Sequence, residues 1–230
     1  MIFETKGLSK RYGRTAALNN VTLGVEAGKI TGLLGPNGSG KTTLIKIAAG
    51  ILTPSAGECF ISGMKPGKDA KAVISYLPDR NYLPEWMKVS RLIEYFRDFY
   101  SDFDTEKAGR MLGELGIGMD RRVRQLSKGT REKLQLIMVM SRNAKLYLLD
   151  EPLSGVDPAT RDYILNTIIR NYDPDAAVLI STHLISDVEN VLDDVIFINK
   201  GEIMLNSSVD EIREAHGKSV DEYFREVFAI

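Results

Sequence analysis

The sequence predicts an α/β fold with a mostly parallel sheet, an N-terminal antiparallel β subdomain and an inserted α-helical subdomain. In the first and last parts of the chain, short apolar runs typical of buried strands alternate with segments of helical periodicity. Between them, the periodic segments are all helical. We therefore expect a single domain over 1–230. Its expected parts are a core from 1–78 and 146–216, a helical subdomain over 79–145 and a C-terminal amphipathic helix over 217–230.

The N-terminal part of the core is expected to hold strands followed by a helix. Residues 3–25 are typical of short strands broken by glycines. Those glycines are Gly7, Gly13 and Gly24. Residues 30–34 are a compact apolar run, and the apolar residues after them recur at helical spacing as far as Gly50, a candidate C-cap. Residues 72–77 predict a further strand.

Three helices are expected in the middle of the chain. The first begins near Ser90, and its apolar residues are expected on one face. That face consists of Leu92, Ile93, Phe96, Phe99 and Tyr100. Asp104 is the expected N-cap of the second helix, which ends near Gly116, and Ser127 is the expected N-cap of the third.

The strand and helix pattern of the core resumes after residue 145. Residues 146–149 form an apolar run that ends in Asp150 and Glu151, and a helix is expected from about Pro158. Three further elements are a strand over 177–181, a helix over 184–192 and a strand over 195–199. The last segment has an apolar stripe at helical spacing, which predicts packing on the domain. The stripe consists of Val220, Tyr223, Phe224, Val227 and Phe228.

Composition and charge exclude several classes of protein. The 230 residues hold 30 Lys and Arg against 31 Asp and Glu, and a formal net charge of −1 gives no reason to expect a nucleic acid partner. The single cysteine cannot form an intrachain disulfide, which suits a reducing compartment. The longest apolar runs fall short of the roughly 18 residues of a membrane span. Charged residues near the N-terminus occupy positions that are apolar in a signal peptide. We expect a chain that neither crosses a membrane nor is secreted.

A phosphate-binding pattern lies between the expected strand over 30–34 and the helix after it. The residues Gly35, Pro36, Asn37, Gly38, Ser39, Gly40, Lys41 and Thr42 match G-x-x-x-x-G-K-[ST], and Thr43 follows them. Gly38 and Gly40 allow backbone N–H groups to point at phosphate oxygens, to which the helix presents its positive end. Lys41 can reach the β- and γ-phosphates, and the Thr42 hydroxyl can bind Mg²⁺. The alternative is a glycine-rich turn without a ligand.

Two acidic residues end the apolar run over 146–149. A strand that ends in Asp150 places a carboxylate at the carboxyl edge of the sheet, where ligands bind in such folds. Asp150 is expected to bind Mg²⁺ directly or through water, and Glu151 stands where a base could polarise an attacking water. Without the phosphate-binding pattern, a solvated pair at a strand end would be the preferred interpretation.

With these motifs in order, the chain resembles the ATP-binding cassette (ABC) ATPases over nearly its whole length. The run from Leu126 to Thr130, LSKGT, is similar to the family's signature, usually LSGGQ. Residues 154–157 resemble its D-loop, and His183 resembles its switch histidine. Tyr12 stands where members stack an aromatic ring on adenine. The resemblance implies a P-loop NTPase fold, ATP hydrolysis, and ATP and Mg²⁺ as cofactors.

The resemblance also implies partners. Two nucleotide-binding subunits, identical or different, would close head-to-tail around two ATP molecules. Each ATP would lie between the phosphate loop of one subunit, with its Lys41, and Ser127 and Gly129 of the other, with Asp157 nearby. Glu151 would act as general base, and His183 would hold the γ-phosphate and the attacking water. A separate transmembrane permease would hold this cytoplasmic chain at the inner face of the cell membrane.

Three residues depart from the family's usual pattern. Asp79 replaces a glutamine that contacts Mg²⁺ and the attacking water, and we expect it to keep a metal-sensing role with stronger dependence on Mg²⁺. Lys128 replaces the first glycine of the signature pair and adds positive charge beside the partner's phosphate, and Thr130 replaces the glutamine. In containing a lysine, this signature resembles the signatures of ABC-2-type exporters. The resemblance therefore favours export as the direction of transport.

One segment has two interpretations, and two further residues have a structural interpretation. The segment 81–87, which includes Trp86, either contacts the permease or packs inside the helical subdomain. His216 and Cys59 are interpreted as structural. Two alternative functions are an ABC-type ATPase acting on nucleic acid or ribosomes, and a P-loop kinase. The length leaves no room for a second cassette or a long coiled coil, and a kinase would not explain the signature.

Overall fold

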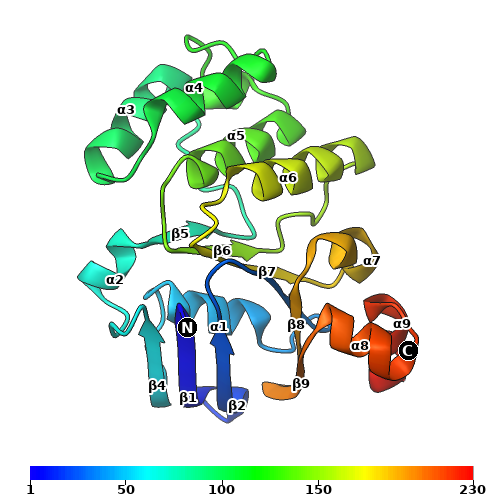
Figure 1. Cartoon of the computed structure of the whole chain (residues 1–230). Coiled ribbons are helices and arrows are strands. Elements are labelled where there is room, and N and C mark those ends of the chain that lie inside the picture. The colour runs from blue at the N-terminus through cyan, green and yellow to red at the C-terminus, as the bar shows by residue number, and fades with distance from the viewer. Residues whose placement is uncertain (230) are drawn as a thin grey trace.

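The computed structural model describes residues 1–229, which form two β-sheets and the helices around them (Figure 1). One sheet has three antiparallel strands in the order β2-β1-β4. The other has six strands in the order β5-β6-β7-β3-β8-β9, and all neighbours in it are parallel except β8 and β9. The expected α/β class, with an antiparallel sheet and a mostly parallel one, is confirmed.

The antiparallel sheet shows that two of the expected strand breaks are wrong. Its strands are β1 (Phe3–Tyr12), β2 (Thr15–Val25) and β4 (Ala56–Ile61). Gly7 lies inside β1, where its φ of +58° accommodates a register shift against β2. Gly24 lies inside β2 opposite Glu4, whereas Gly13 does form the turn between the strands. Gly7 therefore marks irregular pairing, and neither Gly7 nor Gly24 marks the end of a strand.

The mixed sheet carries the core of the protein. Its strands are β3 (Ile30–Leu34), β5 (Ile74–Leu77), β6 (Leu146–Asp150), β7 (Ala177–Thr182), β8 (Asp194–Asn199) and β9 (Glu202–Ser208). Every residue of β3, β6 and β7 is buried, as expected of parallel strands covered on both faces. Alternate residues face opposite sides, so that Tyr147 and Leu149 join one hydrophobic cluster and Leu146 and Leu148 join the other.

Helices cover both faces of the mixed sheet. On one face lie α5 (Lys128–Met140) and α6 (Pro158–Asn171), and on the other lie α1 (Lys41–Ala48) and the antiparallel sheet (Figure 1). The expected strand over 72–77 begins only at Ile74, because α2 (Lys68–Ala72) precedes it. The expected continuous helix over 184–192 is instead α7 (Ile185–Val188) followed by a 3₁₀ turn over Glu189–Val191.

The helices of the middle segment surround a hydrophobic cluster of their own. They are α3 (Val89–Phe99), α4 (Thr105–Glu114) and α5, with a 3₁₀ turn over Val123–Gln125. The expected N-caps are confirmed, since Asp104 accepts from the backbone N–H of Lys107 at 2.8 Å and Ser127 accepts from that of Thr130 at 3.2 Å. Phe99 was expected on the inner face of α3, but its side chain is 68% exposed and packs against Tyr95.

The chain ends in α8 (Val209–His216) and α9 (Val220–Phe228), which lie beside β8 and β9 (Figure 1). Three aromatic residues of α9 surround the buried ring of Phe197 in β8, with ring centroids 5.2 to 6.2 Å away. They are Tyr223, Phe224 and Phe228. The stripe thus packs on the domain as expected, although Ile230, the last residue of the expected helical range, lies outside the described residues.

Candidate active site

The phosphate-binding pattern forms the loop between the end of β3 and the start of α1. Gly38 has a φ of +78° and Gly40 a φ of +114°, which are conformations that side chains disfavour. A Cβ on Gly40 would also lie 2.6 Å from the carbonyl oxygen of Ala17. Glycine is therefore required at position 40 both by backbone conformation and by the close approach of β2.

This loop and the ends of β6 and β7 enclose a cavity of about 400 Å³. Its lining residues are Ala17, Asn37, Gly38, Ser39, Gly40, Lys41, Thr42, Thr43, Asp79, Glu151, Ser154 and His183. The cavity brings together the phosphate loop, the acidic strand end and the expected switch histidine, from three separate parts of the sequence. It lies at the carboxyl edge of the parallel strands, as predicted for a ligand site.

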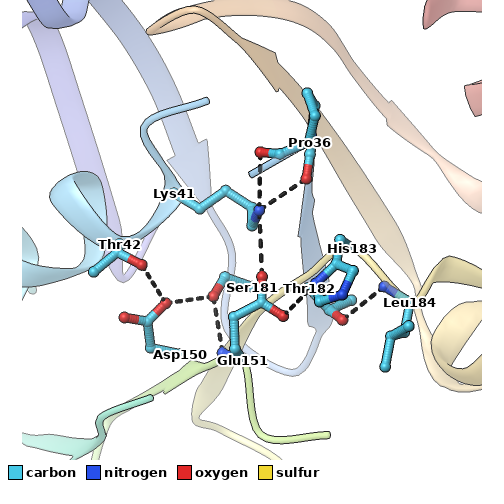
Figure 2. Close-up of polar contacts among 10 residues, drawn as sticks. Pro36, Lys41, Thr42, Asp150, Glu151, Ser181, Thr182, His183 and Leu184 are labelled. Carbon is cyan, nitrogen blue, oxygen red and sulfur yellow. Dashed lines mark hydrogen bonds and ion pairs between the residues drawn. The ribbon is translucent and has the colours of Figure 1, made fainter. Parts of the chain in front are cut away.

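Lys41 is the cationic centre of the cavity. Its side chain is only 5% exposed, and its ammonium donates to the carbonyl oxygens of Gly35 at 2.8 Å and Pro36 at 3.3 Å. It also lies 3.3 Å from Oε1 of Glu151 (Figure 2). A buried ammonium held mainly by carbonyl oxygens and one carboxylate is suited to bind an anion that enters the cavity.

Asp150 is fully buried, and one of its two carboxylate oxygens has hydrogen-bond donors. Oδ1 accepts from the hydroxyls of Thr42 at 3.0 Å and Ser181 at 2.7 Å (Figure 2). Oδ2 has no hydrogen-bond partner among residues 1–229. Burial raises the pKa of Asp150, and the hydrogen bonds from Ser181 and Thr42 oppose that rise.

These oxygens fit a magnesium ion. Mg²⁺ prefers hard oxygen ligands and usually takes one or two carboxylates together with phosphate and water oxygens. The unpartnered Oδ2 of Asp150 and the hydroxyl of Thr42 are such donors, and the Asp79 carboxylate lines the same cavity. No group of three or more His, Cys, Asp or Glu residues within the described part of the chain could hold a metal by itself. The donor set therefore suits a metal that arrives with a phosphate ligand.

Glu151 is held in an unusual backbone conformation. Its φ of +50° lies in the left-handed region, and its N–H donates to the carbonyl oxygen of Ser181 at 3.0 Å and to the Ser181 hydroxyl at 3.1 Å. Its carboxylate lies between two nitrogens, with Oε1 facing Lys41 and Oε2 lying 2.9 Å from Nδ1 of His183 (Figure 2). The geometry gives the carboxylate a fixed direction into the cavity.

Ser127, Gly129 and Asp157 do not line this cavity. Ser127 and Asp157 cap the N-termini of α5 and α6, and a Cβ on Gly129 would lie 3.9 Å from Oδ2 of Asp157. The two helix starts thus lie side by side. The Lys128 ammonium links them further by donating to the carbonyl oxygen of Gly155 at 3.2 Å.

Tyr12 also lies outside the cavity lining. Its ring is half exposed, with the Lys10 ammonium 5.3 Å from its centroid. Ala17, from β2, does line the cavity. The antiparallel sheet therefore reaches the cavity at Ala17.

Sequence reasoning missed Ser181, which contacts both acidic residues of the strand end. The signal that could have found it is the register of parallel strands, because Ser181 of β7 lies directly opposite Asp150 of β6. A hydroxyl in an otherwise apolar strand, next to a strand ending in a carboxylate, predicts that contact.

The structure also tests three interpretations of single residues. Trp86 is 67% exposed, so the interpretation that it packs inside the helical subdomain is wrong. Cys59 is buried in a hydrophobic cluster, and His216 stacks on Tyr223 with ring centroids 4.0 Å apart, in agreement with structural roles. No helix within residues 1–229 has both the length and the apolar character needed to cross a membrane.

Comparison with known proteins agrees with the geometry. A family model described as ABC transporter matches residues 18–154. The chain is 30% identical over 220 residues to the ABC transporter ATP-binding protein YtrB of Bacillus subtilis, covering 94% of this chain and 75% of YtrB. It is 27% identical over 219 residues to the SkfA peptide export ATP-binding protein SkfE of the same organism, covering 93% and 92% of the two chains. A solved ATP-binding subunit of an ABC transporter superposes with a TM-score of 0.90 at 25% identity, covering 99% and 100%.

Proposed function

From the premise that the chain belongs to the ABC transporter family and is an ATPase of that family, we propose that it powers export through a separate permease. The observation that carries this proposal is the cavity in which the phosphate loop meets Glu151 and His183, with the buried Asp150 bonded to Thr42 of that loop. Each of these groups has a defined task in phosphoryl transfer to water.

The phosphate loop would bind and orient the nucleotide. Backbone N–H groups over 38–42 and the N-terminus of α1 favour an anion, and Lys41 would exchange its carbonyl partners for the β- and γ-phosphate oxygens. Thr42, Asp150 and Asp79 would hold Mg²⁺, which when bound neutralises phosphate charge. Tyr12 would provide the surface for the adenine ring, because it is half exposed on the neighbouring sheet.

Glu151 and His183 would act on the attacking water. The Glu151 carboxylate would accept a proton from that water, and general-base catalysis of this kind contributes about 10²- to 10⁴-fold. Nδ1 of His183 lies 2.9 Å from Oε2 of Glu151. With a proton on Nδ1 alone, Nε2 would accept a hydrogen bond from the attacking water, and with a second proton on Nε2 it would donate to a γ-phosphate oxygen. His183 would thus orient the base and the reacting groups together.

A second nucleotide-binding subunit would complete each site. Ser127, Gly129 and Asp157 lie at two adjacent helix starts outside the cavity, which presents N–H and hydroxyl groups to a partner molecule. In a head-to-tail dimer they would face the γ-phosphate bound by the partner's loop. The subunits can be two copies of this chain or this chain and a different cassette.

A permease would receive the work of hydrolysis. Trp86, exposed on the segment 81–87, offers the type of side chain that dominates protein interfaces. Docking there would hold the chain at the cytoplasmic face of the membrane. Two observations support export: Lys128 in the signature, and the likeness to SkfE, whose name describes peptide export. No nucleic acid partner is proposed, because the net charge is −1.

Co-expression with a multi-span membrane protein encoded beside the chain tests this proposal. We expect the two proteins to co-purify from detergent-solubilised membranes and ATP hydrolysis to rise in the complex. A chain that hydrolyses ATP but purifies with ribosomes or RNA would contradict the transport role. Transfer of phosphate to a small molecule, in place of release of free phosphate, would contradict the hydrolytic role.

A further inference from the structure

Ser181 occupies a position between the two acidic residues of the candidate active site. It is completely buried in β7 and pairs in register with Asp150 of the neighbouring strand β6. Its hydroxyl donates to Oδ1 of Asp150 at 2.7 Å and accepts from the backbone N–H of Glu151 at 3.1 Å (Figure 2). One hydroxyl therefore contacts the expected metal ligand and the expected base at the same time.

Packing alone does not explain a hydroxyl at this position. Val178, Leu179 and Ile180, which precede Ser181 in β7, are buried apolar residues that belong to the two main hydrophobic clusters. A buried hydroxyl destabilises a protein unless it is hydrogen-bonded, and among residues 1–229 this one has its partners in Asp150 and Glu151.

We propose that Ser181 is a positioning residue that holds Asp150 and Glu151 in the geometry the ATPase reaction requires. This inference rests on the proposed function. The hydroxyl fixes the Asp150 carboxylate through Oδ1, and Oδ2, which has no partner within residues 1–229, is left as the oxygen that would serve Mg²⁺ directly or through water. It also helps to hold Glu151 at a φ of +50°, from which the carboxylate reaches Lys41 and His183.

Ser181 is expected to affect the Asp150 carboxylate more than the Glu151 backbone. Without the hydroxyl, the one donor to Oδ1 of Asp150 among residues 1–229 would be Thr42, which is itself an expected metal ligand. The N–H of Glu151 keeps the carbonyl oxygen of Ser181 at 3.0 Å. Loss of the Ser181 hydroxyl should therefore disturb the orientation of Asp150 more than the backbone of Glu151. Metal affinity should fall as a result. Loss of a residue that orients a metal ligand typically weakens metal binding about 10- to 100-fold.

The test measures Mn²⁺ binding to the chain in the presence of ATP, with Glu151→Gln in every variant so that ATP is not consumed. Electron paramagnetic resonance counts free Mn²⁺, and a fluorescent ATP analogue in EDTA reports nucleotide affinity without metal. Ser181→Ala is expected to weaken Mn²⁺ binding about 10-fold or more and to leave metal-free nucleotide binding within about twofold. Ser181→Thr, which keeps the hydroxyl, should restore most of the affinity, and Ser181→Cys, similar in size but a weaker donor, should lie between.

Ser75→Ala is the matched control. Ser75 is also a buried serine of the mixed sheet, and its hydroxyl donates to the carbonyl oxygen of Val139 at 2.8 Å, not to a residue of the site. Equal Mn²⁺ affinities in Ser181→Ala and the parent, or an equal loss in Ser75→Ala, would overturn the role of Ser181. A parent that binds no nucleotide would overturn the proposed function itself, so the two failures are distinguishable.

Discussion

The ammonium of Lys41 lies 3.3 Å from Oε1 of Glu151, with the two side chains 5% and 12% exposed. The residue expected to bind phosphate and the residue expected to act as base thus form one nearly buried ion pair. A phosphate of ATP that binds Lys41 would compete with the Glu151 carboxylate for the ammonium. Glu151 would then keep its contact with Nδ1 of His183. In the proposed mechanism, nucleotide binding and activation of the base would therefore be coupled through Lys41.

Replacement of Glu151 by glutamine is expected to separate binding from hydrolysis. Because the ion pair is lost, Lys41 becomes available to phosphate, and ATP affinity should stay equal or rise several-fold. Because the base is lost, phosphate release should fall by about 10²- to 10⁴-fold. Equilibrium binding of a fluorescent ATP analogue and a phosphate-release assay measure the two effects. Glu214→Gln, an exposed glutamate on α8, is the control and should change neither. Hydrolysis that persists in Glu151→Gln would assign the base to another group.

Asp79 should make hydrolysis unusually dependent on metal concentration. Its carboxylate lines the cavity that holds Lys41 and Thr42, and without a metal it would repel the γ-phosphate. Asp79→Gln removes that repulsion and the charge that attracts Mg²⁺. We expect the Mg²⁺ concentration for half-maximal rate to rise about three- to tenfold, with ATP binding in EDTA improved. Indistinguishable Mg²⁺ titrations of the two proteins would refute the metal-sensing role.

Motifs predicted the site better than they predicted the elements around it. The loop over 35–42 and the strand end at Asp150 could be placed because each combines an apolar run with residues of fixed chemistry. The strand β9 and the helices α2 and α8 were not predicted, since they lie at edges where polar and apolar residues mix. Ser181 could not be found from its own segment, because its role depends on pairing with a strand 31 residues away. Contacts between strands distant in sequence require register, which periodicity alone does not give.

Lys128 should matter for the assembled site and little for folding. Its ammonium donates to the carbonyl oxygen of Gly155, but the side chain is 71% exposed, so Lys128→Met should change the free energy of unfolding by less than about 0.5 kcal/mol. ATP binding by the isolated chain should not change, because Lys128 does not line the loop cavity. ATP-dependent association of subunits should weaken about three- to tenfold, as measured by analytical ultracentrifugation. Lys68→Met, on the exposed surface of α2, is the control. Unchanged association would remove Lys128 from the shared site.

Trp86 should contribute to a partner interface and not to stability. Because its side chain is 67% exposed, Trp86→Ala should shift the free energy of unfolding by no more than about 0.5 kcal/mol. An exposed tryptophan at the centre of an interface contributes about 2 kcal/mol or more, so co-purification with the permease should drop about 30-fold. Phe99→Ala, which removes a similarly exposed ring from α3, serves as the comparison. Full retention of permease by Trp86→Ala would place the interface elsewhere.

Cys59 should make stability fall at alkaline pH. Burial raises the pKa of its thiol from 9.0 to about 12. Below pH 9 the thiol is protonated in both folded and unfolded chains and adds no pH dependence. Above pH 9 the unfolded chain releases the proton and the folded chain keeps it, so the free energy of unfolding falls by about 1.4 kcal/mol per pH unit until the pH approaches 12.

Between pH 7.5 and 10.5 this effect amounts to about 2 kcal/mol. Urea unfolding of the native chain and of Cys59→Ala at both pH values isolates it, because other groups titrate equally in the two proteins. The alanine variant loses packing at both pH values but should lose about 2 kcal/mol less than the native chain on going to pH 10.5. Rapid alkylation of the folded chain by iodoacetamide at pH 8 would contradict the premise, since a 3% exposed, protonated thiol reacts only after opening.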